Sequence, residues 1–189
     1  MRLNADEWDK AYRSGEDYTP VTDDKLDKIL GYLPENGGNI AVDLGSGTGH
    51  LARELQSRGF SVTGLDLSYD AVKRARNQSD PMDIHYEVAD FETDFSPKFG
   101  PADLVTAKLV YAFIQDRQRF LRNVKNLLKA NGRFALVNPL KSNVPEHKKH
   151  IALETEQIVR ELEDDLEMVD YYVDDGDEYF ICRNFDDKT

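Results

Sequence analysis

Apolar positions in the middle of the chain recur with two spacings that follow each other in turn. Five short apolar runs predict β-strands, at residues 39–44, 61–67, 84–90, 102–109 and 133–138. Stretches with helical spacing lie between them, including 48–57, 69–77 and a helix that ends near Gly132 and carries Phe120, Leu121, Val124, Leu127 and Leu128 on one face. Alternating strands and helices are typical of a parallel sheet with helices on both faces. The pattern therefore predicts a doubly wound α/β fold, which binds ligands at the carboxyl ends of its strands.

The two ends of the chain differ from this middle part. Residues 1–38 read as helices, and two strand-like runs near the end flank Asp175–Gly176, a pair suited to the tight turn of a β-hairpin. The hairpin is antiparallel and brings the number of strands to seven, in a mostly parallel sheet. We expect one domain over residues 1–189, with a cofactor-binding core at 39–139 and a substrate-side loop, helix and hairpin at 140–189.

Composition and charge narrow the class of protein. The net charge is −12, and residues 146–189 hold 15 Asp/Glu against five Lys/Arg. An acidic chain without a basic stripe is not expected to bind nucleic acid. Apolar runs of only about five residues predict no membrane span, and the start shows no secretory signal. Two interpretations of the acidic quarter stay open: a solvated helix and hairpin, or a docking face for a basic protein.

Cysteine and histidine usage points to a cytoplasmic protein without a resident metal. Cys182 is the single cysteine, which excludes an intrachain disulfide and a multi-cysteine zinc site. His147 and His150 stand three residues apart, but no third ligand is evident. We therefore expect a cytoplasmic location and no metal site.

A glycine-rich turn follows the first strand. Gly45, Gly47 and Gly49 occupy its first, third and fifth positions, whereas the dinucleotide fingerprint requires glycine at the sixth, where His50 stands. Asp43 precedes the turn, and its carboxylate would repel a pyrophosphate at the following helix N-terminus but attract an ammonium group. The Lys-Ser/Thr pair of a P-loop is missing. The turn therefore favours a cationic ligand without phosphate.

Further acids end the next two strands. Asp66 is placed to accept hydrogen bonds from both hydroxyls of a ribose. Asp90, in the sequence Ala89–Asp90–Phe91, can accept from the exocyclic amine of adenine. A ligand that is cationic at one end and an adenosine at the other is S-adenosylmethionine.

These segments together resemble the class I (Rossmann-like) S-adenosylmethionine-dependent methyltransferases, in particular their small-molecule branch. The resemblance runs through VDLGSGTG, VTGLDLSYDAVKRAR, VADFE, ADLVTAKLVYAFI and LLKANGRFALVNP, over about residues 39–139. It implies that the glycine turn lies against the methionine part, with Asp43 facing the ammonium end. It also implies that Asp66 binds the ribose, that Ala89 and Asp90 lie at the adenine, and that Leu67 and Phe91 enclose the ring.

No strong catalytic constellation is visible, and methyl transfer from a sulfonium needs none, because positioning and desolvation do much of the work. Lys108 ends the fourth strand and is a weak catalytic and cofactor-binding candidate; its alternative is a stem that only packs beside the ligand. Tyr12 and Tyr18 lie in the N-terminal segment, which in related enzymes forms a lid. We read His50 as a surface residue of the first helical turn.

The acceptor side shows one cationic cluster, in LKSNVPEHKKH at residues 140–150. It is either a solvated loop or the means of steering an anionic small molecule. The sequence thus predicts a methyltransferase that acts on a small-molecule acceptor. The alternatives are a cofactor-binding regulatory subunit of a methyltransferase complex and an NAD-dependent oxidoreductase, the latter disfavoured by Asp43 and His50.

Overall fold

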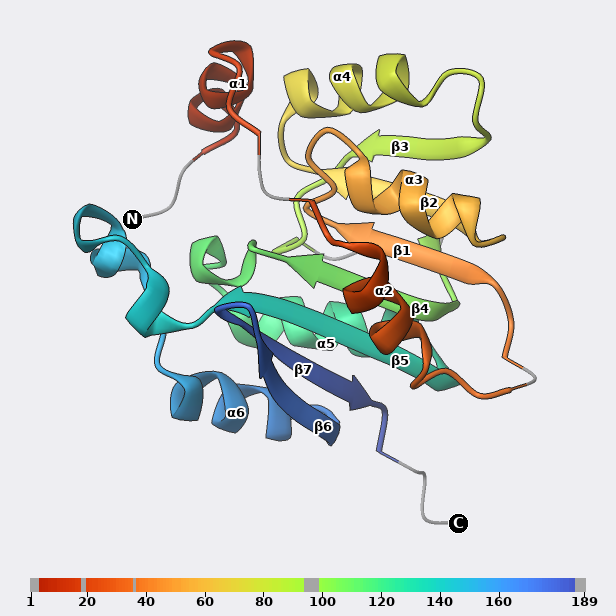
Figure 1. Ribbon diagram of the computed structural model, residues 1–189, viewed down its shortest axis with the longest axis vertical. Helices are drawn as coiled ribbons and strands as arrows, with labels where there is room; N and C mark the ends of the chain where they lie inside the picture. Colours follow the sequence, from red (N-terminus) through yellow and green to blue (C-terminus); the bar gives the residue numbers. More distant parts are fainter. Residues whose placement is uncertain (1–3, 18–19, 36, 94–98, 186–189) are drawn as a thin grey trace.

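The computed structural model describes residues 4–17, 20–35, 37–93 and 99–185. A central sheet lies between two layers of helices (Figure 1), which confirms the predicted α/β architecture. Its strands are β1 (Ile40–Leu44), β2 (Ser61–Asp66), β3 (Ile84–Val88), β4 (Ala102–Lys108), β5 (Leu128–Pro139), β6 (Glu167–Asp174) and β7 (Asp177–Arg183). The α-helices are α1 (Ala5–Arg13), α2 (Asp23–Leu30), α3 (His50–Ser57), α4 (Tyr69–Ser79), α5 (Arg117–Leu127) and α6 (Thr155–Glu163). Short 3-10 turns are η2 (Tyr111–Phe113), η3 (Lys141–Asn143) and η4 (Glu146–Ile151).

The strand order of the sheet is β3-β2-β1-β4-β5-β7-β6. Strands β1 to β5 run parallel, while β7 is antiparallel to both of its neighbours. The chain winds outward in one direction from β1 to β3 and in the other from β4 onward. The order therefore reverses between β1 and β4, the place where open α/β sheets bind their ligands.

Two apolar cores cover the two faces of the sheet. One gathers α2, α3 and α4, with Leu26 and Leu55 fully buried; the other gathers α5 and α6, with Phe120 and Leu162 fully buried. Side chains alternate along β1, so that Ala41 faces the first core and its neighbour faces the second. Burial of an aromatic such as Phe120 is worth about 3–5 kcal/mol against alanine.

Local signals in the sequence form several element ends as expected. The hydroxyl of Ser68 accepts a hydrogen bond from the N–H of Ala71 and so caps α4. Asp175 and Gly176 both have positive φ angles, 48° and 82°, as a primed hairpin turn requires. The predicted hairpin of β6 and β7 is thus confirmed.

The boundary between α5 and β5 differs from the prediction. The helix ends at Leu127, not near Gly132, and Leu128 is already a strand residue paired with Ala102. The register shifts between Ala102 and Leu104. The free backbone groups of β4 are satisfied by this long partner strand, and that pairing overrides the helical spacing of the side chains. No helix among the described residues is long and apolar enough to cross a membrane.

Candidate active site

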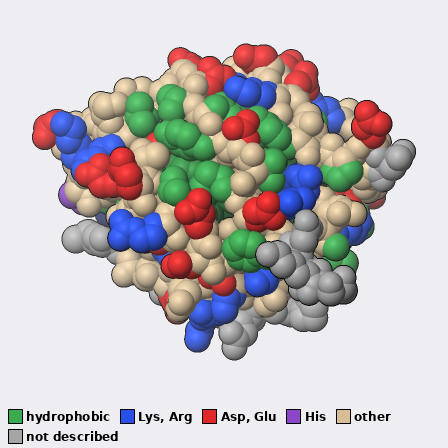
Figure 2. All heavy atoms as spheres, turned by 90° about the horizontal axis from the view of Figure 1, so that it is seen from below, with side chains coloured by type: hydrophobic (Ala, Val, Ile, Leu, Met, Phe, Trp, Pro, Cys, Tyr) green, Lys and Arg blue, Asp and Glu red, His purple; other side chains and the backbone are tan. Residues whose placement is uncertain are grey.

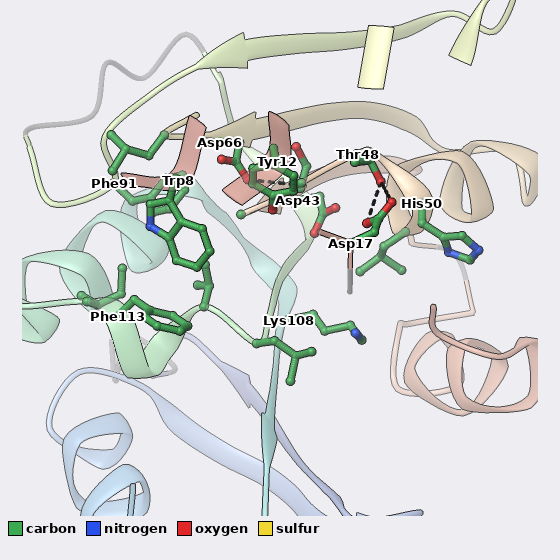
Figure 3. A pocket seen from close by; sticks show the side chains of 18 of the residues that line it. Trp8, Tyr12, Asp17, Asp43, Thr48, His50, Asp66, Phe91, Lys108 and Phe113 are labelled. Carbon is green, nitrogen blue, oxygen red and sulfur yellow. Dashed lines mark hydrogen bonds between the residues drawn. The ribbon is translucent and has the colours of Figure 1, made fainter. Parts of the chain in front are cut away.

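A pocket opens at the carboxyl ends of β1 to β4 (Figure 3), on the side of the sheet where α1 also lies in Figure 1. The predicted site residues that line it are Tyr12, Asp43, Gly45, Gly47, Asp66, Leu67, Asp90, Phe91 and Lys108. Gly49 and Ala89 do not line it, and Tyr18 lies outside the described residues. The side chains divide the pocket: Trp8, Phe91 and Phe113 lie at one end, His50 and Lys108 at the other (Figure 3). One end is therefore aromatic and the other polar.

The glycine turn is built from left-handed backbone. Gly45, Gly47 and Gly49 have φ angles of 74°, 53° and 82°, which side chains on L-residues rarely allow. A Cβ on Gly45 would lie 2.4 Å from Cγ2 of Val110, and one on Gly49 would lie 2.3 Å from the hydroxyl of Tyr86. The turn therefore needs glycine both for its backbone and for the close packing around it. Gly49 thus supports the pocket from behind.

Asp43 is a buried carboxylate at the end of β1, only 2% exposed. Its Oδ1 accepts a hydrogen bond of 2.7 Å from the hydroxyl of Thr106 on the neighbouring strand. Burial raises the pKa of Asp43 to about 6, although the bond from Thr106 and the nearby Lys108 act in the opposite direction. A buried acid of this kind is stabilised by any cation that enters the pocket.

Asp66 ends the adjacent strand and is also buried. Its two oxygens accept hydrogen bonds from the N–H groups of Gly47, at 2.8 Å, and Ser68, at 2.9 Å. Burial nevertheless raises its pKa to about 6. A carboxylate has about four lone-pair sites, so Asp66 keeps acceptor capacity after holding the glycine turn in place.

The third strand end closes the aromatic side of the pocket. Oδ1 of Asp90 accepts from the N–H of Glu92 at 3.0 Å, which fixes the turn after β3. Phe91 is 6% exposed and packs edge to face against Phe120 of α5, with ring centroids 6.4 Å apart. Ala89 donates its N–H to the carbonyl of Asp66 instead of reaching the pocket. It therefore connects two strand ends.

Lys108 is mostly buried at the end of β4. Burial lowers the pKa of its ammonium group, and the charges of Asp177 and Asp43 oppose that shift. Asp43 ends the neighbouring strand β1 and lines the pocket with Lys108, whereas Asp177 starts β7, two strands away, and is not a lining residue. The charges of the two acids favour the ammonium form of Lys108, against the larger effect of burial.

The N-terminal segment covers the pocket and is tied down at several points. Asp9 accepts hydrogen bonds from the hydroxyl of Ser68 and the N–H of Asp70, at the start of α4. Asp17 accepts from the hydroxyl of Thr48 in the glycine turn, at 2.9 and 3.0 Å. Trp8, next to Asp9 in the chain, packs edge to face on Phe113, with centroids 4.9 Å apart. These contacts hold the segment over the pocket, and its role as a lid stays a prediction.

Several pocket residues, among them His50 and Leu109, received no site role in the sequence analysis. His50, read there as a surface residue, lines the pocket, and its Nδ1 is buried without a hydrogen-bond partner among the described residues. Leu109 has a positive φ of 59°, which a non-glycine residue adopts at a cost of about 1–3 kcal/mol. A hydrogen bond from its N–H to the carbonyl of Val137 holds this conformation. The position of Leu109 directly after a buried strand was the only signal for it in the sequence.

The cationic segment 140–150 lies on the same side of the sheet as the pocket (Figure 1) but contributes no lining residue. Two of its lysines form ion pairs: Lys141 with Glu154, and Lys149 with Glu146 at 2.5 Å. Among the described residues, no three His, Cys, Asp or Glu side chains are arranged to hold a metal ion. The segment is therefore a neighbour of the pocket and not part of its wall.

Comparison with known proteins agrees with this geometry. The sequence model of a family described as a methyltransferase domain matches residues 42–136, half of the chain. The chain belongs to this methyltransferase family. Membership implies S-adenosylmethionine as the cofactor, in agreement with solved neighbours of the same fold.

Individual relatives are more distant. A ubiquinone biosynthesis O-methyltransferase of Coxiella burnetii is 30% identical over 107 residues, which cover 53% of this methyltransferase and 44% of the relative. The chain thus spans less than half the length of that relative. A methyltransferase structure from Aquifex aeolicus superposes with a TM-score of 0.72 at 15% identity, covering 84% of this chain and 89% of its own. One from Haloferax volcanii, in complex with the Trm112 methyltransferase activator, reaches 0.76 at 19%, covering 96% and 97%.

Proposed function

We propose that this chain transfers the methyl group of S-adenosylmethionine to a small-molecule acceptor. One observation carries the proposal: acids from three successive strand ends, Asp43, Asp66 and Asp90, line a single pocket with a left-handed glycine turn. The pocket also has an aromatic end and a polar end. A ligand with adenine at one end and an amino acid at the other matches both ends.

The residues present fit this ligand. Asp43 would bind the ammonium group, since a nearby cation stabilises its buried negative charge. Asp66 would accept from the ribose hydroxyls with its remaining lone pairs, and Asp90 from the adenine amine. Leu67 and Phe91 would enclose the ring at the aromatic end. When bound, the cofactor supplies a methyl group that is already activated by its positively charged sulfur.

Lys108 would bind the carboxylate at the amino-acid end of the cofactor. Its ammonium stands near Asp43, so the two side chains present opposite charges to a zwitterion. This pairing supports a role in binding over a role as general base. Burial lowers the pKa of Lys108 and the charges of Asp177 and Asp43 act against that shift, so the pairing with Asp43, and not the pKa, supports the binding role.

The remaining contribution of the protein is to position the acceptor and exclude water. Trp8 and Tyr12 cover the pocket from the N-terminal segment, and the ties of Asp9 and Asp17 hold that segment closed. Orientation and desolvation of this kind are worth roughly 7–11 kcal/mol of a reaction barrier. A nucleophile that arrives unprotonated needs no general base.

Three observations support a small anionic acceptor. The acidic chain lacks the basic surface of a nucleic-acid methyltransferase. A relative with 30% identity is named for ubiquinone biosynthesis. The segment 140–150 adds Lys148 and Lys149 on the ligand side of the sheet, where they would attract a carboxylate or phosphate.

The test is turnover of the purified chain against a panel of metabolites, read out as release of S-adenosylhomocysteine. The proposal expects turnover with at least one anionic small molecule and none with DNA or RNA. A parallel assay adds an activator of the kind bound to the Haloferax volcanii neighbour. Turnover only in its presence would favour the alternative of a subunit that needs a partner. Turnover with nucleic acid alone would contradict the proposed acceptor class.

A further inference from the structure

Strand β6 forms an open edge of the sheet. It is last in the strand order and, among the described residues, pairs only with β7. An edge strand presents a row of N–H and C=O groups that another extended chain can pair with. Proteins usually protect such edges with charged or bulged residues.

Three large apolar side chains of β6 are exposed, on the strand that runs beside α6. Val169, Tyr171 and Val173 are 42%, 37% and 48% exposed. Tyr171 and Val173 share one face, whereas Val169 lies at a register shift between Met168 and Asp170. Tyr171 is held in place by packing on Phe180 and by a hydrogen bond from its hydroxyl to Glu178. Figure 2, which views the molecule from the side of β6 and α6, shows hydrophobic side chains gathered at the centre with Asp, Glu, Lys and Arg around them.

The opposite edge of the sheet, β3, is protected in the usual way. His85 and Glu87 stand two residues apart on it, so their side chains share one face, where they lie 3.4 Å apart. Val88 is its only large apolar side chain that is exposed, among the residues the structure describes. Strand β6 also has a register shift and acidic residues, but it exposes three large apolar side chains, Val169, Tyr171 and Val173, which together form an apolar stripe that β3 lacks.

The charge around the stripe decides what can cover it. Residues 154–177, which include α6 and β6, hold 11 Asp/Glu and one Arg, Arg160. Glu156, Glu163 and Asp164 are exposed beside β6. A second copy of the chain would bring two such acidic fields together, whereas a basic partner would be attracted by them. Charge complementarity therefore favours a partner of opposite sign.

We propose that β6 is a docking strand for an extended segment of a basic protein. The partner would add an eighth strand to the sheet, with alternate apolar side chains against Val169, Tyr171 and Val173 and with Lys or Arg near the acidic border. This role goes beyond methyl transfer. It assigns the acidic C-terminal quarter to recognition.

Two blocked peptides test the proposal on the full chain. The probe is Lys-Val-Thr-Val-Thr-Val-Lys, and its matched control is Glu-Val-Thr-Val-Thr-Val-Glu. We expect the Lys peptide to bind at least about tenfold more tightly, with an affinity that falls between about 0.1 M and about 1 M NaCl as the charges are screened. Amide signals of β6 should shift and become protected from hydrogen exchange. Equal affinity for both peptides, or shifts confined to another surface, would overturn the proposal.

Substitutions on the two edges locate the binding. Val169→Lys and Val173→Lys should each reduce the affinity for the Lys peptide at least about tenfold, because they place charge on the apolar stripe and repel the probe. Val88→Lys on β3 carries the same change at 42% exposure and should have no effect. Unchanged melting temperatures show that the variants fold. Sedimentation of the chain alone tests whether a second copy of the chain pairs with β6. Self-association that Val173→Lys abolishes would show that it does, and would overturn the proposal.

Discussion

Each end of the sheet buries a carboxylate, and the pKa values of the two acids are shifted in opposite directions. At the amino end, Asp103 of β4 accepts hydrogen bonds from Lys129 at 2.7 Å and from the N–H groups of Ile40 and Gly38. Burial acts to raise its pKa, but these bonds outweigh burial and the pKa lies below its ordinary value. At the carboxyl end, burial dominates and raises the pKa of Asp43 to about 6.

The difference distinguishes an acid that stabilises the fold from acids that bind a ligand. The amino end is complete without a ligand, since its acid has a cation and two amides of its own chain. The carboxyl end keeps carboxylates at Asp43 and Asp66 whose charge is poorly compensated, and a cationic ligand would supply what is missing. Unfavourable charge in a pocket is thus the sign of a binding site, and satisfied charge the sign of a structural one.

Substitution of these two acids gives the largest expected contrast. In the folded protein the pKa of Asp43 is raised, so ionisation above pH 6 destabilises the fold. Asp43→Asn should therefore increase the free energy of unfolding at pH 8 by up to about 3 kcal/mol, while weakening S-adenosylhomocysteine about 100-fold. Asp103→Asn should lower the free energy of unfolding by about 2 kcal/mol, because Lys129 loses its partner. It should leave the ligand affinity unchanged.

Chemical denaturation and calorimetry measure both quantities. A change of the unfolding free energy in the same direction in both variants would contradict this contrast.

Glycines at the two ends should differ in the same way. Gly49→Ala combines a positive φ with a clash against the buried Tyr86 and should cost about 2 kcal/mol or more of unfolding free energy. Gly59 has a φ of 88° but open space around it, so Gly59→Ala should cost only about 1 kcal/mol. Urea unfolding of both variants checks this. An equal loss would mean that the turn is not closely packed.

Acidification should weaken the ligand at the carboxyl end. Asp43 must be ionised to attract the ammonium group, and protons compete below its pKa of about 6. Affinity for S-adenosylhomocysteine should be constant above pH 7 and about tenfold lower at pH 5. In Asp43→Asn this dependence should be much reduced. A flat profile in the unsubstituted protein would remove the charge argument for Asp43.

The cover of the pocket should have a smaller effect. The hydroxyl of Tyr12 lies against Gly47, 2.9 Å from where a Cβ would stand. Tyr12→Phe should weaken S-adenosylhomocysteine roughly three- to fivefold, the worth of about one hydrogen bond. Tyr172→Phe, far from the pocket on β6, is the matched control. Unchanged affinity and turnover in Tyr12→Phe would refute the role of this residue in closing the site.

The smallest effect is expected outside the pocket wall. The double variant Lys148→Gln and Lys149→Gln should raise the KM of an anionic acceptor about two- to threefold at low salt, and less at high salt, because steering by exposed charges is screened. Lys73→Gln on α4 should change nothing. A KM that stays constant in the double variant at low salt would exclude steering by segment 140–150.

Much of the donor side could be predicted because it depends on local signals. Apolar runs mark where strands end, and a parallel sheet brings those ends together, so Asp43, Asp66 and Asp90 could be assigned to one site. Non-local contacts were harder to foresee. The early end of α5 follows from pairing of Leu128 with β4, and the strained Leu109 from its bond to β5. Side-chain direction was missed at His50.

Calorimetric titration of the purified chain at pH 8 tests the central claim most directly. The claim is that the pocket binds a cationic nucleoside without phosphate. S-adenosylmethionine and S-adenosylhomocysteine should each bind at one site per chain, and NAD should give no binding heat. Binding of NAD together with no response to either sulfur ligand would contradict the account.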